Sequence, residues 1–594
     1  MSSSAADNMT LSPSPDFDRR SGPIALIIMD GVGVAPPKEW NAFHCARTPF
    51  LDDLLSGKMT HLNNSHSKDV HVITGELDAS GKSVGLPSMG DMGNSEVGHN
   101  AMGAGRVFDQ GAKLVNKAFD SGDFREEKVW KWLMENCVGG NKEEGKGTLH
   151  MIGLYSDGNV HAHVNHVFKL IDAAIDDGVK KIRLHVLADG RDVSEKSVLD
   201  YVGPLEKRLD NIRKTAGVDV RIASGGGRMV TTMDRYEANW EVVQNGWKAH
   251  VLADTDSLES FPSYAEAVKH YYDADDKIID QYLPPFVIVD AESKEPVGRM
   301  QDGDSVLFWN FRGDRAIEIS KAFEAPEGKF DAFDRGDMPK VRYAGMMQYD
   351  GDAQIPDKFV VTPPAIKRTV GEYAVKNGRK RFSISETQKF GHVTYFYNGN
   401  RAAKFDEKME KYTCIPSYQE REDTRPWMRC AEITDAALKE MDEFKPDLIV
   451  LNYANGDMVG HTGNNSAARI AMECVDLCLT RIVPAIVKKG GAVIVTADHG
   501  NCDIMAEVDK KTGEAKPGSQ PEGWKALTSH TKQVVPVAIV GKGMGKYEFN
   551  SEARWADDKD CKHPGIANLG ATVLNLLGLE KPADFLPPVL KKKE

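Results

Sequence analysis

The chain has 594 residues, a net charge of −13 and an apolar content of 41%, which is typical of a globular protein of two to four domains. The negative charge argues against general binding to nucleic acids or anionic membranes, so any attraction for an anion must be local. No apolar run reaches the roughly 18–20 residues of a membrane-spanning helix. The eight scattered cysteines favour a reducing compartment, and we expect a cytoplasmic protein.

The first 22 residues are rich in Ser, Pro and Asp and lack the apolar segment of a signal peptide. This composition predicts a disordered extension over residues 1–22. Beyond it, strand-like runs alternate with helical stretches, a pattern that predicts an α/β protein with mainly parallel sheets. One βαβαβ series is expected from a strand that begins near residue 148, a helix at 163–178, a strand at 181–192, a helix at 196–216 and a strand at 218–228.

A second series lies near the end of the chain, with apolar strands at 447–453, 492–497 and 534–541 and a helix at 466–489. The strand at 24–29 has no neighbour of its own and resembles this later group. We therefore expect two doubly wound α/β domains, one of them discontinuous. The predicted ranges are 23–112 with 364–594 for the discontinuous domain and 113–363 for an inserted one, with the Pro-Pro pair of VVTPPAIK at the second crossing.

Three aspartates follow apolar strand-like runs: Asp30, Asp457 and Asp498. Ligands of open α/β sheets gather beyond the carboxyl ends of strands. Histidines accompany two of the aspartates, as Asp457-x-x-x-His461 and Asp498-His499, and the first spacing puts both groups on one side of a helical turn. One such motif alone is more often a capped turn, but their joint occurrence at separate strand ends predicts a metal site.

Two more residues extend this set: His530 lies just before another strand, and Ser95 lies in the Gly-bounded turn of MGNSEVGH. Mixed carboxylate and imidazole ligands suit Mn, Zn, Co or Fe, and the large share of oxygen favours Mn. A serine in such a turn is usually structural and is a weak nucleophile unless it is activated. Two metals would activate it and neutralise phosphate oxygens, so the set predicts phosphoryl transfer.

The region between the two halves has polar strand ends of its own. They carry arginines that suit carboxylate and phosphate groups, together with a histidine and an aspartate: His161, Arg191, Asp192, Arg228, Arg235, Arg312 and Arg315. The set predicts a site for a small, multiply charged anion, and the alternative is a solvated charged rim with a surface histidine. Asp192 beside Arg191 could move a proton. Lys389, expected before an aromatic strand, could contact a phosphate oxygen, although a lone lysine is more often a surface charge.

At these residues the chain resembles the cofactor-independent phosphoglycerate mutases, metalloenzymes of the alkaline phosphatase superfamily. The motifs that carry the resemblance span residues 22–580 and are IALIIMDGVG, MGNSEVGHNAMGAGRV, YSDGNVHAHVNH, LADGRDVSEKS, MDRYEANW, WNFRGDRAIEIS, SETQKFGHVTYFYNG, NYANGDMVGHTG and TADHGN. The resemblance implies a discontinuous, alkaline-phosphatase-like domain that carries the metals. It also implies an inserted α/β transferase-like domain that binds glycerate.

The resemblance also implies individual roles. One metal would be held by Asp457, His461 and His530, and the other by Asp30, Ser95, Asp498 and His499. Ser95 would be phosphorylated transiently, Lys389 would contact the phosphoryl group, and Asp192 would move a proton. The substrate would be held by His161, Arg191, Asp192, Arg228, Arg235, Arg312 and Arg315.

The implied activity is the interconversion of 3-phosphoglycerate and 2-phosphoglycerate in glycolysis and gluconeogenesis. The implied cofactors are two divalent ions, with Mn²⁺ expected and Co²⁺ or Mg²⁺ as alternatives, and no 2,3-bisphosphoglycerate. We expect a monomer whose partner is its small-molecule substrate, without nucleic acid or membrane. The alternatives are a metal-dependent phosphatase or sulfatase of the same superfamily, and a non-catalytic binding protein that keeps the fold.

Overall fold

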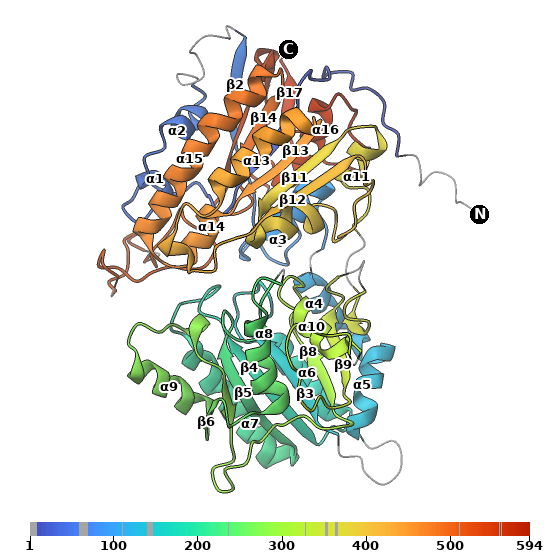
Figure 1. The fold of residues 1–594 in the computed structure, drawn as a ribbon, viewed down its shortest axis with the longest axis vertical. Helices are drawn as coiled ribbons and strands as arrows, with labels where there is room; N and C mark the ends of the chain where they lie inside the picture. Colours follow the sequence, from blue (N-terminus) through green and yellow to red (C-terminus); the bar gives the residue numbers. More distant parts are fainter. Residues whose placement is uncertain are drawn as a thin grey trace, which may run out of the picture. The chain divides into compact units, whose positions relative to one another are not determined.

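The computed structural model describes residues 9–58, 69–109, 111–138, 147–235, 237–326, 328–350, 354–362, 366–509, 511–518, 520–557, 559 and 561–593. The chain forms two compact units (Figure 1): unit 1 consists of Met1–Gln110 and Pro364–Glu594, and unit 2 of Gly111–Pro363. Each unit is built on its own sheet with helices packed against it, so the predicted α/β fold class is confirmed. The Pro-Pro pair expected at the second crossing lies outside the described residues.

In the described part of unit 1, seven strands form one sheet in the order β12-β11-β13-β1-β14-β15-β2. Their bounds are Glu410–Ile415, Arg381–Glu386, Leu448–Tyr453, Ile24–Met29, Ala492–Thr496, Val535–Lys542 and Val70–Leu77. The strands from β12 to β14 run parallel, and β15 is antiparallel to both of its neighbours. The central strands β13, β1 and β14 are buried along their whole length, as their continuous apolar sequences predict.

The register of these strands positions the site. Ile24 of β1 lies beside both Leu448 of β13 and Ala492 of β14. Because the three strands are parallel and in step, their carboxyl ends reach the same edge of the sheet. The loops that follow them therefore meet at that edge, as the strand-end argument predicts.

Helices pack on this sheet in two groups. The first group contains the long helix α15, which lies in front of the sheet in Figure 1 and packs on α13, α1 and α2, with bounds Asn465–Lys488, Cys430–Glu443, Ala42–Cys45 and Pro49–Leu55. The second group contains α3, α11 and α16, which pack on one another, with bounds Ser95–Ala104, Val370–Lys376 and Leu569–Leu576. The short helices α12 and α14 and the hairpin of β16 and β17 complete the unit, at Thr387–Gly391, Asn455–Gly460, Tyr547–Phe549 and Leu590–Lys592.

Two sequence predictions need correction in unit 1. The disordered extension was predicted over residues 1–22, of which residues 1–8 lie outside the described residues. Residues 9–22 pack on the unit: the Phe17 ring stacks on Tyr547 at 4.6 Å and is 6% exposed. The apolar anchor in this polar segment explains its order. The segment after Lys389, expected as an aromatic strand, is α12 followed by a π-helical turn at His392–Phe396. Its buried apolar side chains, Val393, Phe396 and Tyr397, lie at helical spacing.

In the described part of unit 2, eight strands form one sheet in the order β10-β9-β8-β3-β4-β5-β7-β6. Their bounds are Phe359–Val361, Arg342–Met347, Ser305–Phe308, Leu149–Leu154, Lys181–Ala188, Asp219–Gly227, Phe286–Ile288 and Glu259–Phe261. The helices are α4 to α10, at Gly111–Ser121, Lys128–Val138, Val164–Asp176, Val198–Ala216, Trp240–Trp247, Tyr264–Ala274 and Ile317–Glu324, and a π-helical turn at Lys248–Leu252 extends α8. The predicted βαβαβ series is confirmed as β3-α6-β4-α7-β5, and its strands are parallel.

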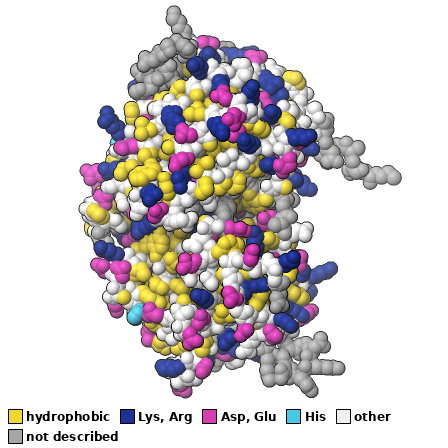
Figure 2. Space-filling view, in the orientation of Figure 1, with side chains coloured by type: hydrophobic (Ala, Val, Ile, Leu, Met, Phe, Trp, Pro, Cys, Tyr) yellow, Lys and Arg dark blue, Asp and Glu magenta, His cyan; other side chains and the backbone are white. Residues whose placement is uncertain are grey.

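Charged groups are mixed on the surface. On the face that Figure 2 shows, Lys and Arg side chains alternate with Asp and Glu side chains over both units rather than gathering by sign. Among the described residues, no helix combines the length and the apolar character that crossing a bilayer requires. Positive charge is concentrated in the interior of unit 2, where arginines that follow the ends of strands are buried: Arg191, Arg228, Arg235, Arg312 and Arg315.

Candidate functional site

Three buried aspartates meet at the carboxyl edge of the unit 1 sheet. Asp30 directly follows β1, Asp457 lies in α14 after β13, and Asp498 lies two residues beyond β14. Their exposed fractions are 0%, 2% and 0%. Three carboxylates removed from water at one place are costly unless cations compensate them.

Glycines allow these loops to approach one another. Gly31 has a φ of +76°, and a Cβ on it would lie 2.5 Å from the Cα of Asp457. Gly98 of α3 faces Asp498, and a Cβ there would lie 3.0 Å from the Asp498 Cβ. Larger residues at either position would separate the aspartate-bearing segments.

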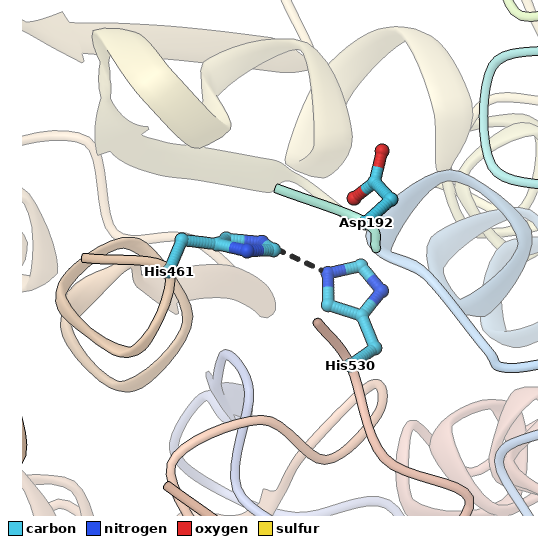
Figure 3. Close-up of side chains that lie close together, drawn as sticks. All are labelled: Asp192, His461 and His530. Carbon is cyan, nitrogen blue, oxygen red and sulfur yellow. Dashed lines mark hydrogen bonds between the residues drawn. The ribbon is translucent and has the colours of Figure 1, made fainter. Parts of the chain in front are cut away.

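His461 and His530 face Asp457 with matching geometry. The helical turn of α14 brings His461 Nε2 to 3.0 Å from Asp457 Oδ1, as the four-residue spacing predicts, and His530 Nε2 lies 3.2 Å from the same oxygen. Figure 3 shows the two rings turned toward each other, with their Nε2 atoms 3.0 Å apart. Each ring contacts a main-chain carbonyl through Nδ1, His461 that of Thr528 at 2.6 Å and His530 that of Gly93 at 2.8 Å. These contacts place the proton on Nδ1 and leave each Nε2 lone pair for a cation.

His499 completes a second group on the other side of the site. Its Nδ1 lies 3.2 Å from the Gly500 carbonyl oxygen, and its Nε2 lies 3.5 Å from Asp30 Oδ1 and 3.7 Å from Asp498 Oδ2. The same Nε2 is 3.0 Å from Ser95 Oγ. Burial lowers the pKa of His499, although Asp457 and Asp30 oppose that effect, and this direction favours the neutral ring that a metal ligand requires.

Ser95 begins α3 and lies against Lys389. The preceding Asn94 caps the helix by accepting a hydrogen bond from the Val97 amide. Lys389 Nζ lies 2.5 Å from Ser95 Oγ and donates to Asp30 Oδ1 at 2.7 Å. It also reaches Asp457 Oδ2 at 2.6 Å. The lysine is 1% exposed, so it belongs to the site and is not a surface charge.

The charge balance of this site favours the binding of metal cations. Burial raises the pKa of Asp498 well above its usual value, and the Asp30 charge adds to that rise. Burial opposes ionisation of Asp457 too, but His461 and Lys389 hold its pKa well below the usual range. Asp498 Oδ2 is buried without a hydrogen-bond partner among the described residues. Two ligand groups lie wholly within the described part of unit 1, Asp457-His499-His530 and Asp30-Asp498-His499, and their oxygen and imidazole donors fit divalent metals.

Two residues of this site were not predicted from the sequence. His99 lies four residues after Ser95 on α3, and its Nδ1 is 2.7 Å from the Ser95 carbonyl oxygen. Asn452, near the end of β13, donates from Nδ2 to Asp30 Oδ2 at 2.7 Å and lies 3.3 Å from His99 Nε2. Burial lowers the pKa of His99 to about 4. The helical spacing from Ser95 was the available signal for His99, whereas a strand asparagine gives none.

In unit 2 the predicted anion-binding residues follow four adjacent parallel strands. His161 follows β3, Arg191 and Asp192 follow β4, Arg228 and Arg235 follow β5, and Arg312 and Arg315 follow β8. Each of these residues is at most 6% exposed. The alternative of a solvated charged rim is wrong, because a rim would be exposed.

Carboxylates orient these arginines. Arg228 Nη1 lies 2.7 Å from Asp189 Oδ1 and also pairs with Asp192. Asp314, a residue that the sequence reasoning missed, lies 3.0 Å from Arg312 Nε and 3.4 Å from Arg235 Nη1. Its place between two arginines in WNFRGDR was the available signal.

The described residues at this site include five guanidinium groups and three carboxylates, so positive charge is in excess. Burial lowers the pKa of Arg315 well below its usual value, and repulsion by Arg235 and Arg191 adds to that effect. The pKa of Arg228 is raised despite burial, because Asp192 and Asp189 stabilise its charge. Burial and the arginines together hold the pKa of His161 well below 6.5. A bound anion would offset this excess, which makes the set a candidate anion site.

Comparisons with known proteins identify the family to which the chain is similar. Residues 22–581 match the model of the metalloenzyme superfamily. A probable 2,3-bisphosphoglycerate-independent phosphoglycerate mutase of Leptospira interrogans is 48% identical over 98% of this chain and 99% of its own length, and the enzyme of Trypanosoma brucei brucei is 45% identical with the same coverage. The crystal structure of Leishmania mexicana phosphoglycerate mutase at low cobalt concentration is 43% identical, covers 98% of this chain and 100% of its own, and superimposes with a TM-score of 0.89.

The chain therefore belongs to the metalloenzyme superfamily and, within it, to the family of 2,3-bisphosphoglycerate-independent phosphoglycerate mutases. The family resemblance seen in the sequence motifs is confirmed. The superfamily and the two ligand groups of unit 1 together support a requirement for divalent metal.

Proposed function

We propose that this protein interconverts 3-phosphoglycerate and 2-phosphoglycerate through a phosphoserine on Ser95, with two divalent metal ions bound in unit 1. The observation that carries the proposal is the environment of Ser95. Its hydroxyl lies at a helix amino end, within 3.0 Å of His499 Nε2 and 2.5 Å of Lys389 Nζ. A buried hydroxyl in contact with a lysine and an imidazole suits a nucleophile that accepts a phosphoryl group.

The metals would be held in two sets. One set is Asp457, His461 and His530, and the other is Asp30, Ser95, Asp498 and His499. Bound divalent ions would lower the pKa of the Ser95 hydroxyl and neutralise phosphate oxygens. We propose Mn²⁺ as the metal, with Co²⁺ and Mg²⁺ as the alternatives to test.

We assign each residue a separate role in the reaction. Ser95 Oγ attacks phosphorus, the bond from phosphorus to the C3 oxygen breaks, and glycerate is released from the phosphorus but not from the protein. Lys389 and the amino end of α3 hold the phosphoryl oxygens. Asp192 takes the proton from the C2 hydroxyl and supplies one to the C3 oxygen. The C2 oxygen then attacks the phosphoserine and the bond from Ser95 Oγ to phosphorus breaks, which returns Ser95 in the ionised form in which it attacked, so no 2,3-bisphosphoglycerate is needed.

The arginines of unit 2 explain why the product is an isomer. His161, Arg191, Arg228, Arg235, Arg312 and Arg315 would hold the glycerate carboxylate and hydroxyls while it reorients. The proposal requires water to be excluded during the transfer, because water would hydrolyse the phosphoserine. A metal-dependent phosphatase could share the unit 1 site, but it has no need for a buried arginine set that retains the leaving group.

The test is a product assay. Purified protein with Mn²⁺ and 3-phosphoglycerate, without 2,3-bisphosphoglycerate, is expected to form 2-phosphoglycerate, measured through enolase, with little inorganic phosphate. Stoichiometric release of phosphate without 2-phosphoglycerate would instead identify a phosphatase. We also propose that the protein is cytoplasmic and monomeric. Sedimentation of the purified chain would measure its oligomeric state.

A further inference from the structure

A chain of buried polar side chains crosses the sheet of unit 2, and the proposed chemistry does not use it. It joins β3, β4 and β5 to the π-helical turn that follows α8, and its members are Asp304, His150, His185, Ser224, His250 and Thr232. Asp304 is 4% exposed, and the other members are at most 1% exposed. We refer to these six residues as the relay.

The hydrogen bonds of the relay are continuous. Asp304 Oδ2 lies 3.2 Å from His150 Nε2, and His150 Nδ1 lies 2.9 Å from His185 Nε2. His185 Nδ1 lies 2.6 Å from Ser224 Oγ. The same hydroxyl oxygen is 2.7 Å from His250 Nδ1, and His250 Nε2 is 2.9 Å from Thr232 Oγ1.

One end of the relay sets the direction of every bond in it. Asp304 already accepts the amides of Thr148 and Gln301, and a carboxylate can only accept. His150 must therefore donate from Nε2, which leaves its Nδ1 to accept from His185 Nε2. The same logic continues to Thr232, whose hydroxyl donates to His250 Nε2. Burial lowers the pKa of His250 to about 3, so the ring is neutral and can accept this bond.

The other end of the relay holds an unusual backbone. Thr232 has a φ of +70°, a conformation that is strained for a β-branched residue. Its amide donates to the Val242 carbonyl at 2.7 Å. Gly246 of α8 leaves space for its side chain, since a Cβ there would lie 1.9 Å from Thr232 Oγ1. The hydrogen bond to His250 therefore helps to hold a turn that would otherwise relax.

This turn lies within the loop that carries two of the anion-binding arginines. Arg228 precedes Thr232 by four residues and Arg235 follows it by three. The neighbouring Met233 carbonyl accepts a hydrogen bond from Arg315 Nη1 at 2.6 Å. The conformation of Thr232 thus contributes to the placement of Arg315, through the Met233 carbonyl, and of the loop that carries Arg228 and Arg235.

We propose that the relay is a positioning device for the anion-binding arginines, in which Thr232 and His250 are positioning residues that hold the 228–235 loop in its binding conformation. The inference rests on the proposed function for the identity of the anion, 3-phosphoglycerate. It assigns a role to a buried network that contains none of the proposed catalytic or substrate-binding residues. It also specifies the tautomer of each ring: Nε2–H for His150 and His185, and Nδ1–H for His250.

The test compares two variants of one residue. Thr232→Val keeps the shape and branching but removes the hydroxyl, whereas Thr232→Ser keeps the donor. Thr232→Val is expected to raise the KM for 3-phosphoglycerate about tenfold with kcat changed less than about twofold, and Thr232→Ser is expected to restore most of the loss. Thr215→Val, on the exposed side of α7, is the matched control. Equal KM values for the Val and Ser variants in a folded, active protein would overturn the proposal.

A second measurement judges the relay without using activity. Nitrogen NMR of histidine-labelled protein is expected to show the three tautomers stated above, and Thr232→Val is expected to shift the His250 Nε2 signal while Thr232→Ser leaves it near the wild-type position. A His250 ring protonated on Nε2 would contradict the relay. If the wild-type protein formed no 2-phosphoglycerate, the proposed function would fail, while these NMR results would still decide whether the relay exists.

Discussion

In unit 1 the side chains beyond β1, β13 and β14 are carboxylates and imidazoles, whereas in unit 2 those beyond β4, β5 and β8 are mainly guanidinium groups. Both sets lie at the carboxyl ends of adjacent parallel strands, and both are buried. The sets differ in the sign of the excess charge: carboxylates predominate in the unit 1 set and guanidinium groups in the unit 2 set. In both units, therefore, the side chains of the site lie beyond the carboxyl ends of parallel strands, and the two sites favour ions of opposite charge. We assign phosphoryl transfer to the first and retention of glycerate to the second.

The largest effect is expected from the nucleophile. Ser95→Ala should lower kcat for 2-phosphoglycerate formation by at least about 10⁴-fold, because no other group can carry the phosphoryl. The coupled enolase assay measures this loss. Ser88→Ala, an exposed serine upstream of α3, serves as the control and should keep wild-type activity. Turnover of Ser95→Ala above a few per cent of wild type would show that the phosphoryl takes another route.

Loss of metal ligands should come next. His461→Ala is expected to lower kcat/KM about 10³-fold and to reduce bound metal measured by elemental analysis. Exposed His71 gives the control variant His71→Ala. Chelation of the wild-type protein should abolish activity, and a metal series should restore it. Full activity in a protein shown to be free of metal would refute the assignment of unit 1.

A variant of unit 2 should change the product rather than stop the chemistry. Arg315→Lys is expected to lower kcat/KM for 2-phosphoglycerate about 100-fold, roughly 3 kcal/mol, because lysine lacks the planar fork of arginine. Phosphoserine should still form, and inorganic phosphate should become a larger share of the product as glycerate escapes. The matched control is Arg208→Lys, whose partly exposed ion pair with Asp172 contributes little. An unchanged ratio of phosphate to 2-phosphoglycerate would contradict the division between the units.

The smallest effect concerns stability and pH. Burial lowers the pKa of His250 from 6.5 to about 3, so between these values the unfolded chain binds a proton that the folded chain does not. The free energy of unfolding must therefore fall as the pH falls through this range, by about 1.4 kcal/mol per pH unit for such a group. His250→Gln should flatten the slope by that amount in urea titrations at several pH values, and exposed His270→Gln should not. Equal slopes for all three proteins would show that His250 is protonated in the folded state.

The sequence predicted the strands and their ends well, for a physical reason. Buried parallel strands such as IALIIM and AVIVT read as continuous apolar runs, and polar residues that follow them lie at the sheet edge. Asp30, Asp457 and Asp498 could therefore be placed together before any coordinates. Segments without such a pattern were less predictable: the residues around Lys389 have aromatic content typical of a strand but form a short helix and a π-helical turn.

Side chains that orient other side chains were the harder part of the site to predict. Asn452 points into the site from within a strand, and the sequence gives no sign of this. The relay could not be predicted from the sequence either, because His150, His185 and Ser224 come from three strands whose register aligns them only in the folded sheet. Periodicity and strand ends reveal where ligands gather, whereas cross-strand partners depend on register.

The most direct test is to look for the phosphorylated nucleophile. Protein mixed with 3-phosphoglycerate and Mn²⁺, quenched in acid within one turnover and digested, should contain phosphate on the peptide with Ser95, and its amount should rise in Arg315→Lys if glycerate is lost before the second transfer. A quenched sample that forms 2-phosphoglycerate but never carries phosphate on Ser95 would contradict the central claim.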